Sequence, residues 1–205
     1  MTISLSDAGK RFNREWIFRH FTYTFEEGRS YAITGPNGSG KSTLLQGIGG
    51  SMHINEGKIE YRIKNKELKN EEVYNHVSFC APYLELVEEM TLKEFLRFHH
   101  GFKPFLPGLT IEKIISILSL EKAANKQIRY YSSGMKQRVK LAQCILSGTA
   151  IVLLDEPCTN LDAAGIKLYI QLINDYCKKR MVIVSSNDHQ EYAFCGEKIN
   201  ILDWK

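Results

Sequence analysis

The sequence lacks any long apolar run. Its longest strongly apolar stretches, Ile151–Leu154 and Met181–Val184, are four residues long, whereas a membrane-spanning helix needs about 20. The first residues alternate between polar and apolar and lack the basic start and apolar core of a secretory signal. We therefore expect a chain that is not exported and does not itself cross a membrane.

Cysteine, charge imbalance and repeats offer little information. The five cysteines are scattered and form no C-x-x-C pair, which disfavours zinc or redox chemistry and suggests reduced thiols. The net charge of +4 is too small to choose among anionic partners. Low-complexity segments and internal repeats are absent, and 205 residues with 43% hydrophobic content suit one folded domain.

What the sequence does contain is an alternation of short β-rich segments and segments of helical period. The expected strands are Ile3–Leu5, Phe21–Phe25, Arg29–Thr34, Lys58–Ile63, His76–Cys80, Ala150–Asp155, Met181–Ser185 and Ile199–Asp203. The expected helices are Lys41–Ile48, Leu92–His100, Ile111–Leu120, Ser133–Ser147 and Gly165–Lys179. This order predicts an α/β fold with a mainly parallel sheet. The charged segment Lys64–Glu72 suits a solvated loop or hairpin tip.

A glycine-rich segment between a predicted strand and a predicted helix fits G-x-x-x-x-G-K-[ST]. It consists of Gly35, Pro36, Asn37, Gly38, Ser39, Gly40, Lys41, Ser42 and Thr43. In such a cradle, backbone N–H groups and a helix N-terminus converge on phosphates. Lys41 is expected to bridge the β- and γ-phosphates of ATP, and the Ser42 hydroxyl to ligate Mg²⁺.

A second apolar strand ends in two acids, Asp155 and Glu156. In a buried parallel strand, carboxylates are tolerated only at the carboxyl end, where ligands of open α/β sheets bind. We expect Asp155 to hold Mg²⁺ through water and Glu156 to polarise the attacking water. The alternative is that the two acids simply end an ordinary strand.

A third motif, Tyr131-Ser132-Ser133-Gly134-Met135-Lys136-Gln137-Arg138, precedes that strand. A Ser-Ser-Gly helix start supplies a hydroxyl and free N–H donors suited to phosphate. Taken alone, Ser132 or Ser133 would be interpreted as a plain helix cap, and the order of the motifs is what favours a phosphate site. Together the three motifs resemble the ATP-binding cassette (ABC) ATPases, with Ser133 and Met135 in a variant signature.

This resemblance covers nearly the whole chain and implies a P-loop NTPase core. Its mainly parallel sheet is joined by N-terminal antiparallel strands and an inserted helical signature subdomain. The single domain would comprise a RecA-like core with its β subdomain at 1–83 and 148–205, and the signature subdomain at 84–147. Two cassettes, here a homodimer, would sandwich two ATPs, so that Ser132, Ser133 and Gly134 meet the partner's γ-phosphate.

Further positions follow from the same resemblance. Phe12 would stack on adenine, with Trp16 as a rival and a core phenylalanine as the alternative. Thr159–Asp162 resembles the loop that touches the opposite cassette. The family's partner is a separate transmembrane permease, so the protein would lie peripherally on the cytoplasmic face of the cell membrane, with no nucleic-acid partner.

Two positions depart from the family pattern. Pro82 or Tyr83 falls where a glutamine normally senses Mg²⁺ and the attacking water. Asn187 takes the place of the histidine that contacts the γ-phosphate, and His189 would substitute only if the loop shifted. Because asparagine donates a neutral hydrogen bond, Asn187 is expected to give weaker catalytic support. These changes affect hydrolysis more than ATP binding.

The membrane partner would contact an exposed apolar patch formed by Pro82, Tyr83, Leu84, Leu86 and Val87. We expect Tyr83 and Leu86 to touch it, although each residue of the patch is equally compatible with packing inside the helical lobe. The chain resembles small ABC-2-type export ATPases, including the heme exporter of cytochrome c biogenesis. The alternatives are a soluble non-transport cassette and an ATP-binding interaction module that scarcely hydrolyses.

Overall fold

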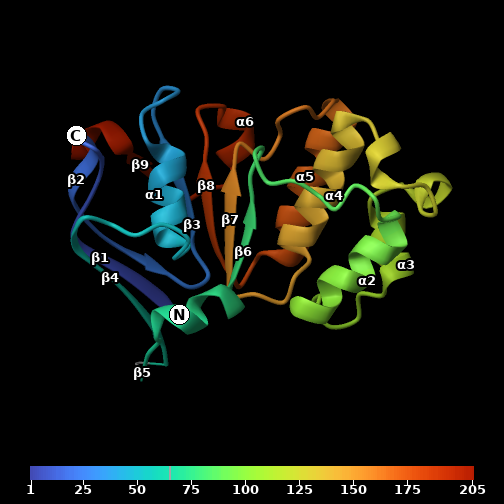
Figure 1. The fold of residues 1–205 in the computed structure, drawn as a ribbon, viewed down its shortest axis with the longest axis horizontal. Helices are drawn as coiled ribbons and strands as arrows, with labels where there is room; N and C mark the ends of the chain where they lie inside the picture. Colours follow the sequence, from blue (N-terminus) through green and yellow to red (C-terminus); the bar gives the residue numbers. More distant parts are fainter. Residues whose placement is uncertain (65) are drawn as a thin grey trace. The chain divides into compact units, whose positions relative to one another are not determined.

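A computed structural model describes residues 1–64 and 66–205 of the protein (Figure 1). The chain forms two compact units. The first comprises residues 1–79, 149–156 and 179–205, and the second comprises residues 80–148 and 157–178. The second unit thus includes residues 157–178, which the sequence-based division assigned to the α/β core.

The first unit contains an antiparallel sheet with strand order β2-β1-β4-β5. Its strands are β1 (Thr2–Phe12), β2 (Glu15–Glu26), β4 (Glu56–Ile63) and β5 (Lys66–Glu67). Alternation along β1 points Ile3 and Leu5 to one face, where both are buried. These N-terminal strands are longer than predicted, and β4 and β5 form the hairpin expected near residue 64; residue 65 lies outside the described residues.

The first unit also carries a five-stranded sheet of order β6-β7-β8-β3-β9. These strands are β3 (Ser30–Thr34), β6 (Val77–Cys80), β7 (Ile151–Asp155), β8 (Met181–Ser185) and β9 (Glu197–Asn200). The β3–β8, β3–β9 and β7–β8 pairs are parallel. All residues of β7 and β8 are buried, which explains their nearly continuous apolar sequence. The predicted α/β fold is confirmed.

One predicted strand, Ile199–Asp203, is partly wrong. β9 ends at Asn200, and Ile201–Trp204 forms a 3₁₀ helix. The Asn200 side chain accepts a hydrogen bond from the Leu202 backbone N–H at 3.2 Å. This local cap competes with the strand ladder, as asparagine side chains commonly do.

Short helices complete the first unit: α1 (Lys41–Ile48), α6 (His189–Tyr192) and a 3₁₀ turn at Asn70–Asn75. On α1, Leu44, Leu45 and Ile48 are fully buried in a core shared with residues of both sheets. Each such side chain contributes about 1.5–3 kcal/mol of burial free energy. This packing fixes the start of α1 against the carboxyl ends of the parallel strands.

The second unit is helical, with α2 (Leu92–Phe102), α3 (Ile111–Ile117), α4 (Ser133–Ile145) and α5 (Ala163–Tyr176). Two 3₁₀ turns, Glu121–Ala123 and Ile128–Tyr130, link α3 to α4. Side chains of Thr91, Thr110, Ser132 and Asp162 cap the four helices. The Thr91-x-x-Glu94 pair forms a full capping box, so the helix starts follow directly from the sequence.

Candidate functional site

The glycine-rich segment forms the turn between β3 and α1. Gly35, Gly38 and Gly40 all have positive φ angles of 146°, 76° and 100°. A Cβ atom on Gly40 would lie 2.3 Å from Ile17 Cγ2. Only glycine fits there, because both the backbone conformation and the contact exclude a side chain.

Lys41 begins α1 and is only 5% exposed. Its Nζ donates hydrogen bonds to the carbonyl oxygens of Gly35 at 2.9 Å and Pro36 at 3.1 Å. The loop therefore curls around the lysine ammonium group. This arrangement holds the positively charged ammonium group of Lys41 at the cradle, where it would attract an anion.

A pocket of about 220 Å³ opens onto this segment. Its lining consists of Ile17, Asn37, Gly38, Ser39, Gly40, Lys41, Ser42, Thr43 and Glu156. The fold thus brings Glu156 beside a cradle more than a hundred residues earlier in the chain. The pocket is smaller than the ~300–1,000 Å³ of sites that enclose a whole ligand, which suits a chain of phosphates rather than an entire nucleotide.

The two acids at the end of β7 differ in their surroundings. Asp155 is 2% exposed, and its Oδ1 has no hydrogen-bond partner among the described residues. Glu156 is half-buried with a φ of 41°, and its backbone N–H donates to the Ser185 carbonyl at 2.9 Å. A non-glycine residue at positive φ is strained and tends to occur where function requires it.

Asn187 follows β8 and reaches the cradle. Its Nδ2 donates a hydrogen bond to Asn37 Oδ1 at 3.1 Å. His189, by contrast, is the first residue of α6, and its ring packs against Tyr192 with centroids 5.4 Å apart. The structure therefore places Asn187, rather than His189, in contact with the glycine-rich loop.

The two candidate aromatic residues lie in different environments. Phe12 ends β1 and is 47% exposed, with Lys10 Nζ 5.0 Å from its ring centroid. Trp16 is half-buried, and the Cζ atoms of Arg11 and Arg19 lie 5.4 Å and 4.5 Å from its ring centroid. Cation–π contacts of this kind occupy an aromatic face.

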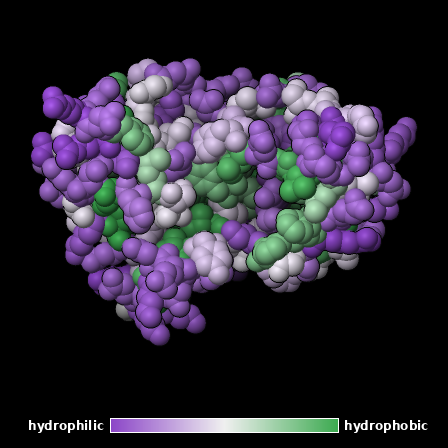
Figure 2. All heavy atoms as spheres, in the orientation of Figure 1, coloured by the Kyte–Doolittle hydropathy of each residue, from purple (hydrophilic) through white to green (hydrophobic). Residues whose placement is uncertain are grey.

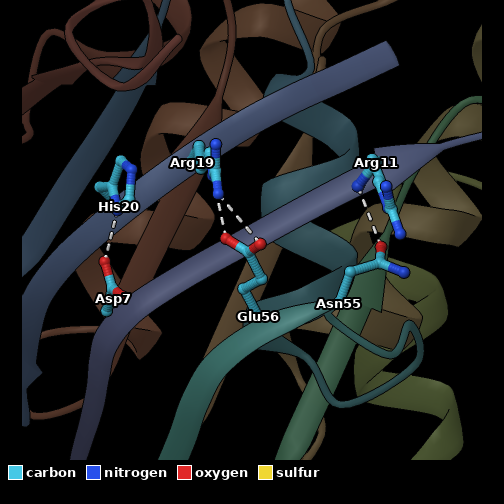
Figure 3. A network of polar contacts seen from close by, with 6 residues as sticks. All are labelled: Asp7, Arg11, Arg19, His20, Asn55 and Glu56. Carbon is cyan, nitrogen blue, oxygen red and sulfur yellow. Dashed lines mark hydrogen bonds and ion pairs between the residues drawn. The ribbon is translucent and has the colours of Figure 1, made fainter. Parts of the chain in front are cut away.

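Figure 3 shows polar contacts that link β1 and β2 to Asn55 and to Glu56, the first residue of β4. Arg19 donates to both carboxylate oxygens of Glu56 at 2.9 Å and 3.1 Å, and this hydrogen bonding raises the pKa of Arg19. The Arg11 backbone N–H donates to Asn55 Oδ1 at 3.0 Å. Because Arg19, which lies against Trp16, is bonded to Glu56 of β4, Trp16 is part of the sheet's packing. Phe12, at 47% exposure, is the more accessible ring.

Ile17 is a pocket residue that the sequence analysis missed. It lies on β2, lines the pocket and would contact a Cβ on Gly40. No sequence signal marks an isoleucine in a β-rich segment as part of a phosphate cradle. Its role became visible only from the packing of β2 against the glycine-rich loop.

The signature segment starts α4 in the second unit. Ser132 is the N-cap, and its Oγ accepts a hydrogen bond from the Met135 N–H at 3.2 Å. Ser132 and Ser133 are nevertheless exposed. A Cβ on Gly134 would come within 3.1 Å of the Asn160 carbonyl. Ser132 is therefore a helix cap whose surface stays accessible to a ligand.

A second pocket, of about 700 Å³, surrounds this helix start. It is lined by Ser119, Leu120, Glu121, Lys122, Ala123, Ser132, Ser133, Gly134, Met135, Arg138, Asn160 and Asp162. Arg138 forms an ion pair with Asp162 at 3.2 Å. Asp162 also accepts from the Gly165 N–H at 2.8 Å, and this bond, followed by Arg138, lowers the pKa of Asp162.

The patch predicted to meet a membrane partner is only partly exposed. Tyr83, Leu84 and Val87 are 51%, 41% and 39% exposed, whereas Leu86 is only 7% exposed. The expectation that Leu86 touches a partner is therefore wrong, because its side chain is buried. Most of the surface visible in Figure 2 is hydrophilic. Among residues 1–64 and 66–205, no helix is long and apolar enough to span a membrane.

Comparisons with known proteins agree with the three motifs. The family model described as "ABC transporter" matches residues 18–159, more than half of the chain. The uncharacterized ABC transporter ATP-binding protein YhcH of Bacillus subtilis is 29% identical over 98% of this chain and 66% of the relative. The cytochrome c biogenesis ATP-binding export protein CcmA of Agrobacterium fabrum is 26% identical over 93% of this chain and 90% of the relative.

Among solved structures, a dimeric post-hydrolysis state of the ATP-binding cassette MJ0796 with bound ADP and Pi superposes with a TM-score of 0.80. The match covers 97% of this chain and 94% of that one at 24% sequence identity. At this identity the match establishes the fold.

Proposed function

The chain belongs to the ABC transporter family, and we propose that it is the subunit that binds and hydrolyses ATP to drive a separate membrane permease. The observation that carries this proposal is the pocket in which Glu156 lies beside the glycine-rich cradle. A carboxylate next to a phosphate cradle can polarise water for attack on a γ-phosphate. The cradle alone accounts for binding, and Glu156 adds the means of hydrolysis.

Within the cradle, we assign phosphate binding to residues Gly35–Thr43. Lys41 exchanges its two carbonyl contacts for the β- and γ-phosphates, because charge-assisted bonds to phosphate are the stronger ones. Phe12 supplies the exposed ring on which adenine stacks. Asn187, held beside Asn37, donates to the γ-phosphate.

The residues present also fit Mg²⁺. Asp155 offers a buried carboxylate oxygen that lacks a protein partner among the described residues, and Ser42 offers a hydroxyl on the pocket wall. Oxygen donors of this kind are those that Mg²⁺ prefers. When bound, Mg²⁺ neutralises charge on the β- and γ-phosphate oxygens. We assign Ser42 and Asp155 to this ion.

A second cassette completes the arrangement. Ser132, Ser133 and Gly134 lie on an exposed helix start in a 700 Å³ pocket, which suits the γ-phosphate of ATP held by a second copy. The dimeric state of the MJ0796 cassette supports pairing of this kind. The pair would associate with the cytoplasmic face of the cell membrane through Tyr83 and its exposed neighbours. The export protein CcmA among the relatives supports export as the direction of transport.

Phosphate release by the Glu156→Gln variant tests this assignment. Removing a general base typically lowers the rate about 10²–10⁴-fold, whereas the neutral isostere leaves the cradle intact. We expect ATP-dependent dimers of the variant to persist in size-exclusion chromatography while turnover is lost. Undiminished turnover would remove Glu156 from the role.

A second candidate function is an ATP-binding interaction module that scarcely hydrolyses. The neutral Asn187 in place of histidine favours it, because a neutral donor stabilises developing charge less well. Measuring turnover of the purified wild-type protein with and without Mg²⁺ separates the two. Mg²⁺-dependent turnover supports the enzyme, and its absence with normal ATP binding supports the module.

A further inference from the structure

Asp155 and Ser185 end neighbouring strands, and each has an unsatisfied buried oxygen. Asp155 is 2% exposed and Ser185 is fully buried. Within residues 1–64 and 66–205, neither Asp155 Oδ1 nor Ser185 Oγ has a hydrogen-bond partner. Buried polar atoms nearly always have one, and each exception calls for an explanation such as an ordered water or ion.

The strand register brings these two residues together. β7 and β8 lie side by side in the parallel sheet (Figure 1), and Asp155 and Ser185 are direct Cα partners. Side chains at paired positions of adjacent strands project to the same face of the sheet. The Glu156 N–H donates to the Ser185 carbonyl at 2.9 Å, which fixes the end of β8 beside the acids.

Two serines whose hydroxyls have partners, one in the same sheet and one just beyond it, show the contrast. Ser78 on β6 is 3% exposed, and its hydroxyl donates to the Ile151 carbonyl at 3.3 Å. It also lies 2.9 Å from Thr149 Oγ1. Ser186 Oγ, one residue beyond β8, accepts from the Asp188 N–H at 2.9 Å. Ser185 alone among these three serines has a hydroxyl with no protein partner.

We propose that Ser185 is a positioning residue for the divalent cation: its hydroxyl and the Asp155 carboxylate together hold one water of the cation's hydration shell. This inference rests on the proposed function. Mg²⁺ keeps several of its waters when bound by one or two carboxylates and substrate phosphates. Groups that orient such ligands affect metal affinity although they do not touch the metal.

The proposal predicts that loss of the Ser185 hydroxyl lowers cation affinity without lowering the stability of the protein. A serine with a purely structural role would change both together. Ser185→Ala removes an unsatisfied hydroxyl, so the cation-free protein should unfold in urea at the wild-type midpoint or above it. Ser78→Ala removes a satisfied hydroxyl, so its midpoint should fall. Cation affinity should show the opposite pattern, with Ser185→Ala weakened about 10-fold and Ser78→Ala unchanged.

The experiment titrates each full-length variant with Mn²⁺ in the presence of saturating ADP and follows free Mn²⁺ by electron paramagnetic resonance. Ser185→Thr, which keeps the hydroxyl, should bind Mn²⁺ better than Ser185→Ala. Equal Mn²⁺ affinity of wild type and Ser185→Ala would overturn the proposal, as would a Ser185→Ala variant whose weak binding follows from a lowered unfolding midpoint.

Mn²⁺ binding by Asp155→Asn and by the wild type distinguishes failure of this inference from failure of the proposed function. If Asp155→Asn weakens Mn²⁺ binding and Ser185→Ala does not, the role of Ser185 is refuted and the cation site stands. If the wild type binds neither ADP nor Mn²⁺, the proposed function itself is refuted, and the inference falls with it.

Discussion

Replacement of Asn187 tests how this cassette manages without the usual histidine. Asn187 Nδ2 makes a neutral, exposed hydrogen bond to Asn37 Oδ1 at 3.1 Å. Such a bond contributes about 0.5–1.5 kcal/mol, while one from a charged donor contributes about 1.5–3 kcal/mol. Histidine at this position, when protonated, should therefore stabilise the transition state by about 1–1.5 kcal/mol more than asparagine does.

That difference converts to a rate. Since about 1.36 kcal/mol corresponds to a tenfold change, we expect Asn187→His to raise kcat roughly 5- to 10-fold and Asn187→Ala to lower it by a similar factor. The measurement is phosphate release at saturating Mg²⁺ and ATP. Histidine should also make kcat depend on pH near its ordinary pKa of about 6.5, with the gain largest on the acidic side.

Two controls keep the result interpretable. Because Asn187 is exposed, both variants should unfold at the wild-type urea concentration. Their affinity for ATP should change less than kcat, since the cradle supplies most of the phosphate contacts. Wild-type turnover by Asn187→Ala would refute the assignment of Asn187 to the γ-phosphate.

Three further predictions follow from the packing. Gly40→Ala adds about 1–3 kcal/mol of backbone strain at a φ of 100°, together with a clash with Ile17. We expect calorimetry to show that this variant no longer binds ATP, and that adding Ile17→Ala restores binding only in part. Full recovery would show that the backbone strain is unimportant. Burial lowers the pKa of His99 to about 4. Because the unfolded chain therefore binds this proton at a higher pH than the folded one, the free energy of unfolding should fall as the pH drops from about 6.5 to about 4. His99→Gln should flatten the pH dependence of urea unfolding, and an unchanged pH dependence would contradict this. Leu86→Ala should cost about 2–5 kcal/mol of stability because the side chain is buried. Tyr83→Asp should leave stability unchanged and reduce co-purification with the permease. A destabilised Tyr83→Asp and a Leu86→Ala of wild-type stability would contradict the exposure of the two residues.

The sequence predicted most of the secondary structure because its local signals agree with the fold. Thr91 with Glu94 and Ser132 before Ser133 mark helix starts that capping chemistry explains. The apolar runs ending at Asp155 and Ser185 are typical of buried parallel strands. Where the prediction failed, at Ile201–Trp204, a single asparagine cap replaced a strand ladder.

The predicted surfaces were harder to obtain from the sequence. Tyr83 and Leu86 look alike as apolar residues near a loop, yet one is exposed and the other is buried. Periodicity cannot separate them because residues 81–90 form no regular helix or strand. The sequence does not mark Ile17 as a pocket residue for a related reason. Its contact with the cradle depends on how β2 packs against Gly40, more than twenty residues away.

Two side chains at the cradle already form hydrogen bonds within the protein. Lys41 Nζ is bound to two carbonyl oxygens, and Asn187 is bound to Asn37. At these two side chains ATP must therefore replace existing bonds, and each exchange contributes only the difference between two hydrogen bonds. The buried oxygens of Asp155 and Ser185 are different, because a hydrated cation would add contacts without breaking any. Nucleotide affinity should consequently depend on the divalent cation more strongly than the phosphate contacts alone would suggest, and comparing ATP affinity with and without Mg²⁺ in Asp155→Asn measures that share.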